Sequence, residues 1–410
     1  MADARQYQLL LSLLRLRPER KENVPLDHVT TNDWNGMVDE AMRHGIAPLI
    51  YARLQAISSG SIVPAEVMEK LKGAYLFHGL KNTQRFHEFS TVLGSFQEEG
   101  ISSIALKGAH LAESVYGNLA LRPMDDLDLL VKKMDLALAE KKLLELGYVH
   151  PEHFKEGSKL GAHHLPSFAK PGGVAVIEVH WMIPPAEPFR IDVDGLWERA
   201  RSAKIAGSET LVLSPEDLLL HLCLHASIHH RFGLGIRPLA DIGETIHRYH
   251  GELDWEQFLR RSRQWHARNC VYLTLLLAKT LLEAAVPDEV LNALRPGDFD
   301  ERLIVWANEQ IAQRSSDLTD PSSVSPRIAQ IMGRGSLSQK AALFFRVVFP
   351  PMEEMALLYH VPPRSGRIFF YYPIRLKDLI FLRGGTIWQV LRRDKTTIVK
   401  AEIYQKLLEG

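Results

Sequence analysis

Three short apolar runs in the middle of the chain constrain the fold more than any other feature of the sequence. They span residues 101–106, 127–131 and 174–179, and each is rich in Ile, Leu or Val. Short apolar runs of this kind predict buried strands. The stretches between them, notably residues 134–146 before Gly147, have helical spacing. The order strand, helix, strand, helix, strand therefore predicts a mixed α/β unit.

Helical patterns occupy the sequence on both sides of this unit. Leu9, Leu10, Leu13 and Leu14 repeat at helical spacing near the start, and long helical patterns return after Pro215. We therefore predict an α+β fold, in which a mixed sheet with flanking helices carries an N-terminal helical cap and a C-terminal helical domain. The predicted divisions are an N-terminal helical region (1–75), the sheet-containing core (76–210), a helical domain (211–314) and a C-terminal helical extension (315–410).

Composition and charge restrict the partners and the compartment. The 410 residues include 49 Lys plus Arg and 49 Asp plus Glu. No overall field attracts polyanions, so an anion site must be local. The two cysteines, Cys223 and Cys270, lie in apolar helical patterns, which indicates reduced thiols. No apolar stretch approaches the roughly 20 residues of a membrane-spanning helix. We therefore expect a cytoplasmic protein with no transmembrane segment.

Two aspartates at the start of the second apolar run carry the clearest chemical signal. Asp126 and Asp128 flank Leu127, and alternation along a strand would project both carboxylates from one face. Like charges this close repel, and a divalent cation relieves the repulsion. Magnesium (Mg²⁺) suits the pair because it prefers oxygen ligands and often binds carboxylates together with substrate phosphates; manganese (Mn²⁺) is the alternative. Asp125 should point to the opposite face and is left out of the site.

The first apolar run ends in a segment suited to phosphate. Lys107 and Gly108 lie between this run and a helical pattern, where a glycine backbone and a helix N-terminus allow close approach to an anion. Lys107 and Arg122 are the cations nearest to the two aspartates in the sequence. We predict that Lys107, Gly108 and Arg122 contact the phosphates of a bound nucleotide.

The third apolar run adds a carboxylate and an imidazole. Glu178 and His180 alternate with apolar residues, so they should lie on one face of the predicted strand. A carboxylate from a neighbouring strand could complete a metal centre, and Glu178 could also accept the proton of an attacking hydroxyl. We favour the role of base for Glu178 and nucleotide contact for His180.

These motifs together resemble a known family. Leu106-Lys-Gly108, Arg122-Pro-x-x-Asp-x-Asp-Leu-Leu-Val131, Gly147-Tyr148 and Glu178-x-His-Trp181 are similar, in this order, to the pattern of the uncharacterised bacterial nucleotidyltransferase family of the DNA polymerase beta superfamily. The resemblance continues through Tyr116, Ser214-Pro-x-Asp217 and Leu239-x-Asp241. It implies a polymerase beta-like nucleotidyltransferase core for the α+β fold.

The resemblance also implies an activity. The family pattern implies metal-dependent transfer of a nucleoside monophosphate from a nucleoside triphosphate to an acceptor, with release of pyrophosphate. Asp126, Asp128 and Glu178 match the carboxylate triad, which implies both catalytic and metal-binding roles for them. ATP is the nucleotide we expect, and the hydroxyl acceptor is not defined by the motifs.

Two departures from the superfamily pattern leave an alternative open. Ala109 stands where a Gly or Ser is usual, and the third carboxylate is Glu178 where Asp is more usual. A catalytically silent nucleotidyltransferase fold, which binds nucleotide or a partner protein as a scaffold, is therefore the second hypothesis.

A set of histidines in the helical part suggests a further alternative. His221, His225 and His229 recur at four-residue steps on one predicted helix face, where a transition metal could bind two of them, and His230 and His247 lie within reach in the sequence. A metallohydrolase that depends on these histidines is thus the third hypothesis. No Glu follows His221 as the zinc-protease pattern requires, so we favour polar residues lining a groove between domains, with His225 beside the nucleotide.

The C-terminal residues 364–400 interleave Arg and Lys with aromatic residues. This composition is compatible with weak contact to a membrane surface or a partner. Amphipathic helices whose aromatic faces pack on the body of the protein have the same composition, and we favour that interpretation.

Overall fold

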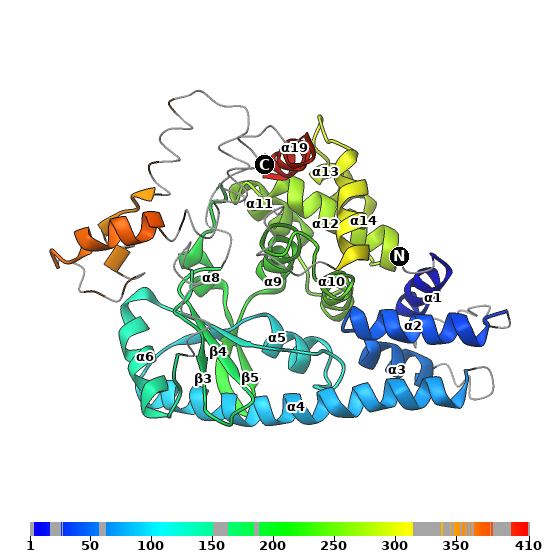
Figure 1. The fold of residues 1–410 in the computed structure, drawn as a ribbon, viewed down its shortest axis with the longest axis horizontal. Helices are drawn as coiled ribbons and strands as arrows, with labels where there is room; N and C mark the ends of the chain where they lie inside the picture. Colours follow the sequence, from blue (N-terminus) through cyan, green and yellow to red (C-terminus); the bar gives the residue numbers. More distant parts are fainter. Residues whose placement is uncertain are drawn as a thin grey trace.

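The fold is α+β, as predicted, and its six-stranded sheet lies between two groups of helices (Figure 1). The long helix α4 (Ala65–Glu98) runs along one side of the sheet, and the helices of the C-terminal half lie on the other (Figure 1). The computed structural model describes residues 4–16, 26, 28–56, 63–150, 163–183, 188–314 and 395–408, with scattered positions between 338 and 379.

The sheet is mixed and joins segments far apart in the sequence. Its strands are β1 (Ser103–Ala105), β2 (Leu127–Val131), β3 (Phe168–Ala169), β4 (Val176–His180), β5 (Arg201–Ile205) and β6 (Ser208–Val212). Their order across the sheet is β3-β4-β2-β1-β6-β5. β2 pairs in parallel with β4 and antiparallel with β1, and β1 pairs in parallel with β6. β1, β2 and β4 fall on the three predicted apolar runs.

The remaining strands were not predicted, for a physical reason. β5 and β6 form a hairpin at the sheet edge, and most of their side chains are polar or partly exposed, so no apolar run marks them. The turn between the two strands indicates a hairpin more clearly than their side chains do. Ala206 and Gly207 both have positive φ values, 52° and 78°, as the tightest two-residue hairpin turns require.

Helix α4 covers one face of the sheet. Phe86, Phe89, Leu93 and Phe96 are buried on the side that packs against the strands. The helix ends just before Gly100, whose φ of 70° favours glycine and lets the chain turn into β1. α4 passes without a break through residue 75; the four-part division of the chain stays a proposal.

Two separate apolar cores lie on the two faces of the sheet. Leu127, Leu129 and Val131 of β2 belong to the core formed with α4 and α6 (Leu136–Glu145). Leu130, from the opposite face of the same strand, belongs to the core shared with the helical domain. Alternation along one strand therefore assigns neighbouring residues to different cores.

The helices after β4 form a bundle on the second face of the sheet. They are α8 (Val193–Arg199), α9 (Pro215–Leu224), the π-helix η4 (His225–His229), α10 (Arg237–Arg248), α11 (Trp255–Gln264), α12 (Arg268–Leu282), α13 (Asp288–Leu294), α14 (Arg302–Gln313) and α19 (Lys395–Leu408). The Ser214 side chain caps the first turn of α9 by accepting a hydrogen bond from the Asp217 amide. The same bundle continues into α19, because the Tyr404 hydroxyl donates to the Ile228 carbonyl at 2.9 Å.

The other helices before residue 136 surround the start of the chain and the sheet. They are α1 (Ala4–Arg15), α2 (Thr31–Arg43), α3 (Ala47–Ala56), α5 (Lys107–His110), the π-helix η1 (Leu111–Val115) and the 3₁₀ helix η2 (Lys133–Asp135). Within the described ranges, no helix is both long and apolar enough to cross a bilayer. The structure describes residues 365–377, 379 and 395–400 of the basic aromatic C-terminal segment; Phe369 and Phe370 are exposed there, whereas Tyr371 and Tyr372 are partly buried against a small apolar cluster. The predicted surface loop at residues 315–325 lies outside the described residues.

Candidate active site

Strand register brings two of the predicted carboxylates together. In the parallel pairing of β2 with β4, Asp128 lies opposite Glu178, and Leu130 lies opposite His180. Paired residues of neighbouring strands point to the same face, so Asp128, Glu178 and His180 share the face toward the helical domain. One ligand atom from each of these three side chains lies within 4.8 Å of the others.

Asp128 is the most deeply buried of the acids and has two basic partners. Its side chain is only 1% exposed, and its Oδ1 lies 3.1 Å from Lys107 Nζ and 2.7 Å from His180 Nε2. Burial alone would raise the pKa of Asp128, but the Lys107 charge and the hydrogen bonds from His180 and Lys107 outweigh burial and hold the pKa well below its usual range. Asp128 is therefore an ionised carboxylate in the core of the protein.

Asp126 lies directly before β2 and has the opposite electrostatic character. Its side chain is partly exposed, while the adjacent Asp125 is exposed. Partial burial and the charges of Asp128 and Glu178 raise the pKa of Asp126 to about 7, against the opposing effect of Lys107. Asp126 therefore lies close enough to the other two acids to be repelled by them, although it is not one of the three residues whose ligand atoms lie within 4.8 Å.

Lys107 and Gly108 begin helix α5 directly after β1. Lys107 has a φ of 30°, an unfavourable backbone conformation for a residue with a side chain. A Cβ on Gly108 would lie 3.0 Å from Met124 Sδ and 3.1 Å from Arg122 Nη1, so a larger residue would require these side chains to shift by a few tenths of an ångström. The Lys107 ammonium group thus contacts Asp128 from a strained backbone position, and little room remains at residue 108.

Glu178 is partly buried and is held by two neighbours. Ser167 Oγ donates a hydrogen bond to Glu178 Oε1 at 2.9 Å, and His180 Nε2 lies 3.5 Å from Glu178 Oε2. Burial and the Asp128 charge raise the pKa of Glu178, but the His180 and His164 interactions outweigh them and lower it. Glu178 is therefore ionised at neutral pH.

Arg122 connects the sheet to the helical domain. Its Nε and Nη2 atoms donate to Asp241 Oδ1 and Oδ2 of α10 at 3.1 and 3.0 Å, which is a two-bond ion pair. The Tyr116 hydroxyl donates to the same Oδ1 at 2.9 Å. Arg122 borders the predicted phosphate segment through Gly108, while its charge is matched by Asp241.

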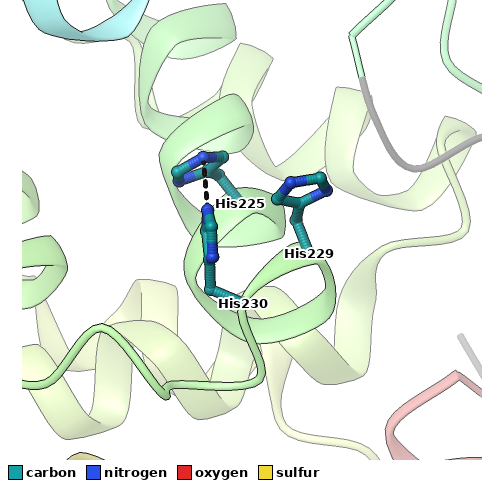
Figure 2. A group of neighbouring side chains, drawn as sticks. All are labelled: His225, His229 and His230. Carbon is teal, nitrogen blue, oxygen red and sulfur yellow. Dashed lines mark hydrogen bonds between the residues drawn. The ribbon is translucent and has the colours of Figure 1, made fainter. Parts of the chain in front are cut away.

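Seven histidines extend from the carboxylates into the helical domain. His163 lies between two groups, with ring centroids 5.5 Å from His180 and 5.6 Å from His229. The second group is His225, His229 and His230, drawn in Figure 2. The remaining two of the seven are His164, beside His180, and His221, beside His225.

The arrangement fits a divalent cation at the carboxylates. Asp128, Glu178 and His180 present ligand atoms within 4.8 Å of one another. The two carboxylates are oxygen donors, which suit Mg²⁺, whereas the imidazole is a nitrogen donor. The charges of Asp126, Asp128 and Glu178 all raise the pKa of Lys107, so this pocket already favours positive charge strongly enough to keep a buried amine protonated.

Comparison with known proteins identifies the chain at family level. A family model described as "Uncharacterised nucleotidyltransferase" matches residues 30–283, more than half of the 410 residues. The chain belongs to this family. No curated protein and no solved structure matches it. In this nucleotidyltransferase family member, the matched region runs from α2 into α12 and contains the carboxylates, Lys107, Arg122, Asp241 and the histidines.

Some neighbours of the site were not predicted from the sequence. Ser167 and His163 lie in a segment without a clear pattern, and only the pairing of β3 with β4 brings that segment to Glu178. Asp241 stood out only as part of the family resemblance, and its partner Arg122 is 119 residues away. His230 falls off the four-residue step that connects His221, His225 and His229, because the step assumes an α-helix and the chain forms a π-helix there.

Proposed function

We propose that this nucleotidyltransferase transfers a nucleoside monophosphate from a nucleoside triphosphate, ATP being the expected donor, to a hydroxyl acceptor and releases pyrophosphate. Membership of the family supports the general class of reaction. The observation that carries the proposal is the β2–β4 register, which pairs Asp128 with Glu178 beneath the helical domain and beside Lys107.

The proposed cofactor is Mg²⁺, with Mn²⁺ as the alternative. Asp126, Asp128 and Glu178 would hold it, in keeping with their mutual electrostatic influence. When bound, such a cation supplies charge neutralisation on the phosphates during transfer. A protonated Asp126 would compete with the cation, so binding should strengthen as the pH rises through about 7.

The proposed roles of base and of nucleotide contact belong to residues of the chain itself. Glu178 is the proposed base, because it is ionised. Among the described residues, only one of the two Glu178 carboxylate oxygens accepts a short hydrogen bond, which comes from Ser167. His180 orients Asp128 through its 2.7 Å contact, and we propose that it also borders the nucleotide. Its Nδ1 is buried without a hydrogen-bond partner among the described residues, so the ring has one nitrogen to spare.

Phosphate contact is proposed for the segment after β1. The Lys107 ammonium group and the Gly108 backbone lie at the start of α5, where a phosphate can approach the chain closely. Arg122 is paired with Asp241 next to this segment, and we propose that its guanidinium also contacts the phosphates. His225, from the helical domain, is proposed to line a groove between that domain and the sheet, beside the nucleotide.

The test uses ATP labelled in two positions. With label on the α-phosphate, the enzyme incubated with Mg²⁺ and fractionated cell extract should form labelled adducts, whereas label on the γ-phosphate should appear in pyrophosphate. The α-label should be lost in Asp128→Asn and retained in Asp125→Asn, which removes an equal charge from an exposed neighbour. Adducts that carry the γ-label would mean phosphoryl transfer instead, and transfer that survives Asp128→Asn would reject the proposed site.

A further inference from the structure

His225, His229 and His230 are brought together by an unusual helix geometry. In an α-helix, residues five apart lie about 140° around the axis from each other, so His225 and His230 would diverge. Here His225–His229 form a π-helix, closed by a 3.0 Å hydrogen bond from the His230 amide to the His225 carbonyl. The wider turn places His225, His229 and His230 around one point (Figure 2). Such π-turns are rare and occur often at functional sites.

The turn is held from behind by several interactions. Ser227 Oγ donates to the Cys223 carbonyl at 2.6 Å, and the Tyr404 hydroxyl donates to the Ile228 carbonyl at 2.9 Å. The two residues that follow the cluster, Arg231 and Phe232, have φ values of 49° and 60°. Two consecutive left-handed residues other than glycine are strained, and strain of this kind persists where the surrounding structure enforces it.

The three imidazoles face one another closely. His225 Nε2 lies 3.1 Å from His230 Nε2. The rings of His225 and His229 are nearly parallel, with centroids 5.4 Å apart, and the centroids of His229 and His230 are 4.6 Å apart. One nitrogen from each of the three rings lies within 4.8 Å of the others. Two facing ring nitrogens need either a shared proton or a shared cation, since two lone pairs would otherwise repel.

The rings are in the form that binds metals. Burial is the largest influence on all three, followed by neighbouring positive charge, and it lowers the pKa of His230 to about 3 and those of His225 and His229 well below the usual range. A neutral imidazole offers a lone pair to a metal without first losing a proton.

We propose that His225, His229 and His230 bind one transition-metal ion of the Zn²⁺ class. Three imidazole nitrogens suit Zn²⁺, Co²⁺ or Ni²⁺ and do not suit Mg²⁺, which requires oxygen ligands. Three protein ligands leave a tetrahedral position open for an oxygen from water or a phosphate. The site adjoins the carboxylates across His163, but it does not depend on nucleotidyl transfer, because it uses different ligands and a different class of metal.

The test begins with binding of the metal alone. Full-length protein, dialysed against EDTA, is titrated with Co²⁺ by visible absorption and with Zn²⁺ against a chromophoric chelator. We expect a tightly bound equivalent at the three histidines that Asp128→Asn retains, whereas any equivalent held at the carboxylates is lost in that variant. His229→Ala and His230→Ala should each weaken binding by at least about 10-fold, since loss of a mere outer partner costs 10–100-fold. His250→Ala, which removes an exposed histidine, should bind as the parent does.

X-ray absorption on the Zn²⁺-loaded parent protein counts the ligands without any variant, in case an alanine variant misfolds. Three imidazoles in the first shell are expected. A shell dominated by carboxylate oxygen overturns the proposal. So does the absence of a stoichiometric equivalent, or an equivalent that is lost in Asp128→Asn but kept in the folded His229→Ala and His230→Ala proteins.

Discussion

The two faces of the central sheet come from the same strands but differ in chemistry. The face toward α4 and α6 carries Leu127 and Leu129, both fully buried in an apolar core. The face toward the helical domain carries Asp128, with Glu178 opposite it on β4. Because side chains alternate along a strand, a two-residue step keeps the chemistry on one face and leaves the other to packing. The reactive groups thus lie on one face of the strand, and that face also contributes Leu130 to the core shared with the helical domain.

The largest difference between the faces should appear in catalysis. Asp128→Asn removes the charge that pairs with Lys107 and a proposed metal ligand, while the amide can still accept a hydrogen bond. We expect nucleotidyl transfer to fall by at least about 100-fold, because outer partners of a metal already contribute up to that factor. Steady-state rates with Mg²⁺, normalised to folded protein by circular dichroism, measure the effect. A transfer rate of Asp128→Asn within a few-fold of the parent rate would show that Asp128 is not part of the catalytic site.

The junction between the sheet and the helical domain should show the largest effect on stability. Asp241→Asn leaves the Arg122 guanidinium, which is 11% exposed, without its counter-charge. Breaking a buried pair from one side costs about 3–5 kcal/mol, measurable by urea unfolding. Glu301→Gln is the control, because its ion pair with Arg295 is largely exposed and such pairs contribute less than about 1 kcal/mol. Equal effects of the two substitutions would contradict this account of the junction.

The apolar face should affect stability without affecting chemistry. Leu129→Ala leaves a cavity in the core with α4 and should lower the free energy of unfolding by about 2–5 kcal/mol. The transfer rate per folded molecule should remain that of the parent at a temperature well below the melting point. A loss of rate comparable to that of Asp128→Asn would show that the two faces are not separate.

The smallest expected effect is the pH dependence of stability at Asp126, because partial exposure screens its charge. Its pKa is raised from 3.8 to about 7 in the folded protein. The folded state therefore binds more protons than the unfolded state between pH 4 and 7, and metal-free protein should lose stability as the pH rises through that window. The pKa of Asp128 is shifted in the opposite direction, so its ionisation affects stability only below this pH window.

Urea unfolding of the parent and Asp126→Asn at pH 5 and pH 8, in EDTA, tests whether the contribution of Asp126 to stability falls as the pH rises. The variant lacks the ionising group, so its stability relative to the parent should be greater at pH 8 than at pH 5. The reverse order would show that Asp126 is not repelled by Asp128 and Glu178.

Local patterns predicted the parts of the site that depend on one strand at a time. Apolar runs marked β1, β2 and β4, and alternation placed Glu178 with His180. Long-range pairing supplied the rest. No local signal links Arg122 to Asp241, or His163 to both His180 and His229.

Two further features depend on backbone geometry and were not predicted from the sequence. An α-helical step joins His225 to His229 but not to His230, and only the π-helix adds the third ring. The hairpin of β5 and β6 has mostly partly exposed or polar side chains, so periodicity did not detect it. Apolar patterning reports burial, and these features are set by hydrogen-bond geometry instead.

Thermal stability with Mg²⁺ and ATP, added separately and together, tests most directly whether the paired carboxylates hold a metal–nucleotide complex. A ligand that binds only the folded state stabilises it by about 2.7 kcal/mol at 100 times its dissociation constant. We predict that the two together raise the melting temperature by more than the sum of their separate effects, in the parent and in Asp125→Asn but not in Asp128→Asn. A parent protein that ATP and Mg²⁺ leave unchanged, or an Asp128→Asn protein that they stabilise equally, would contradict it.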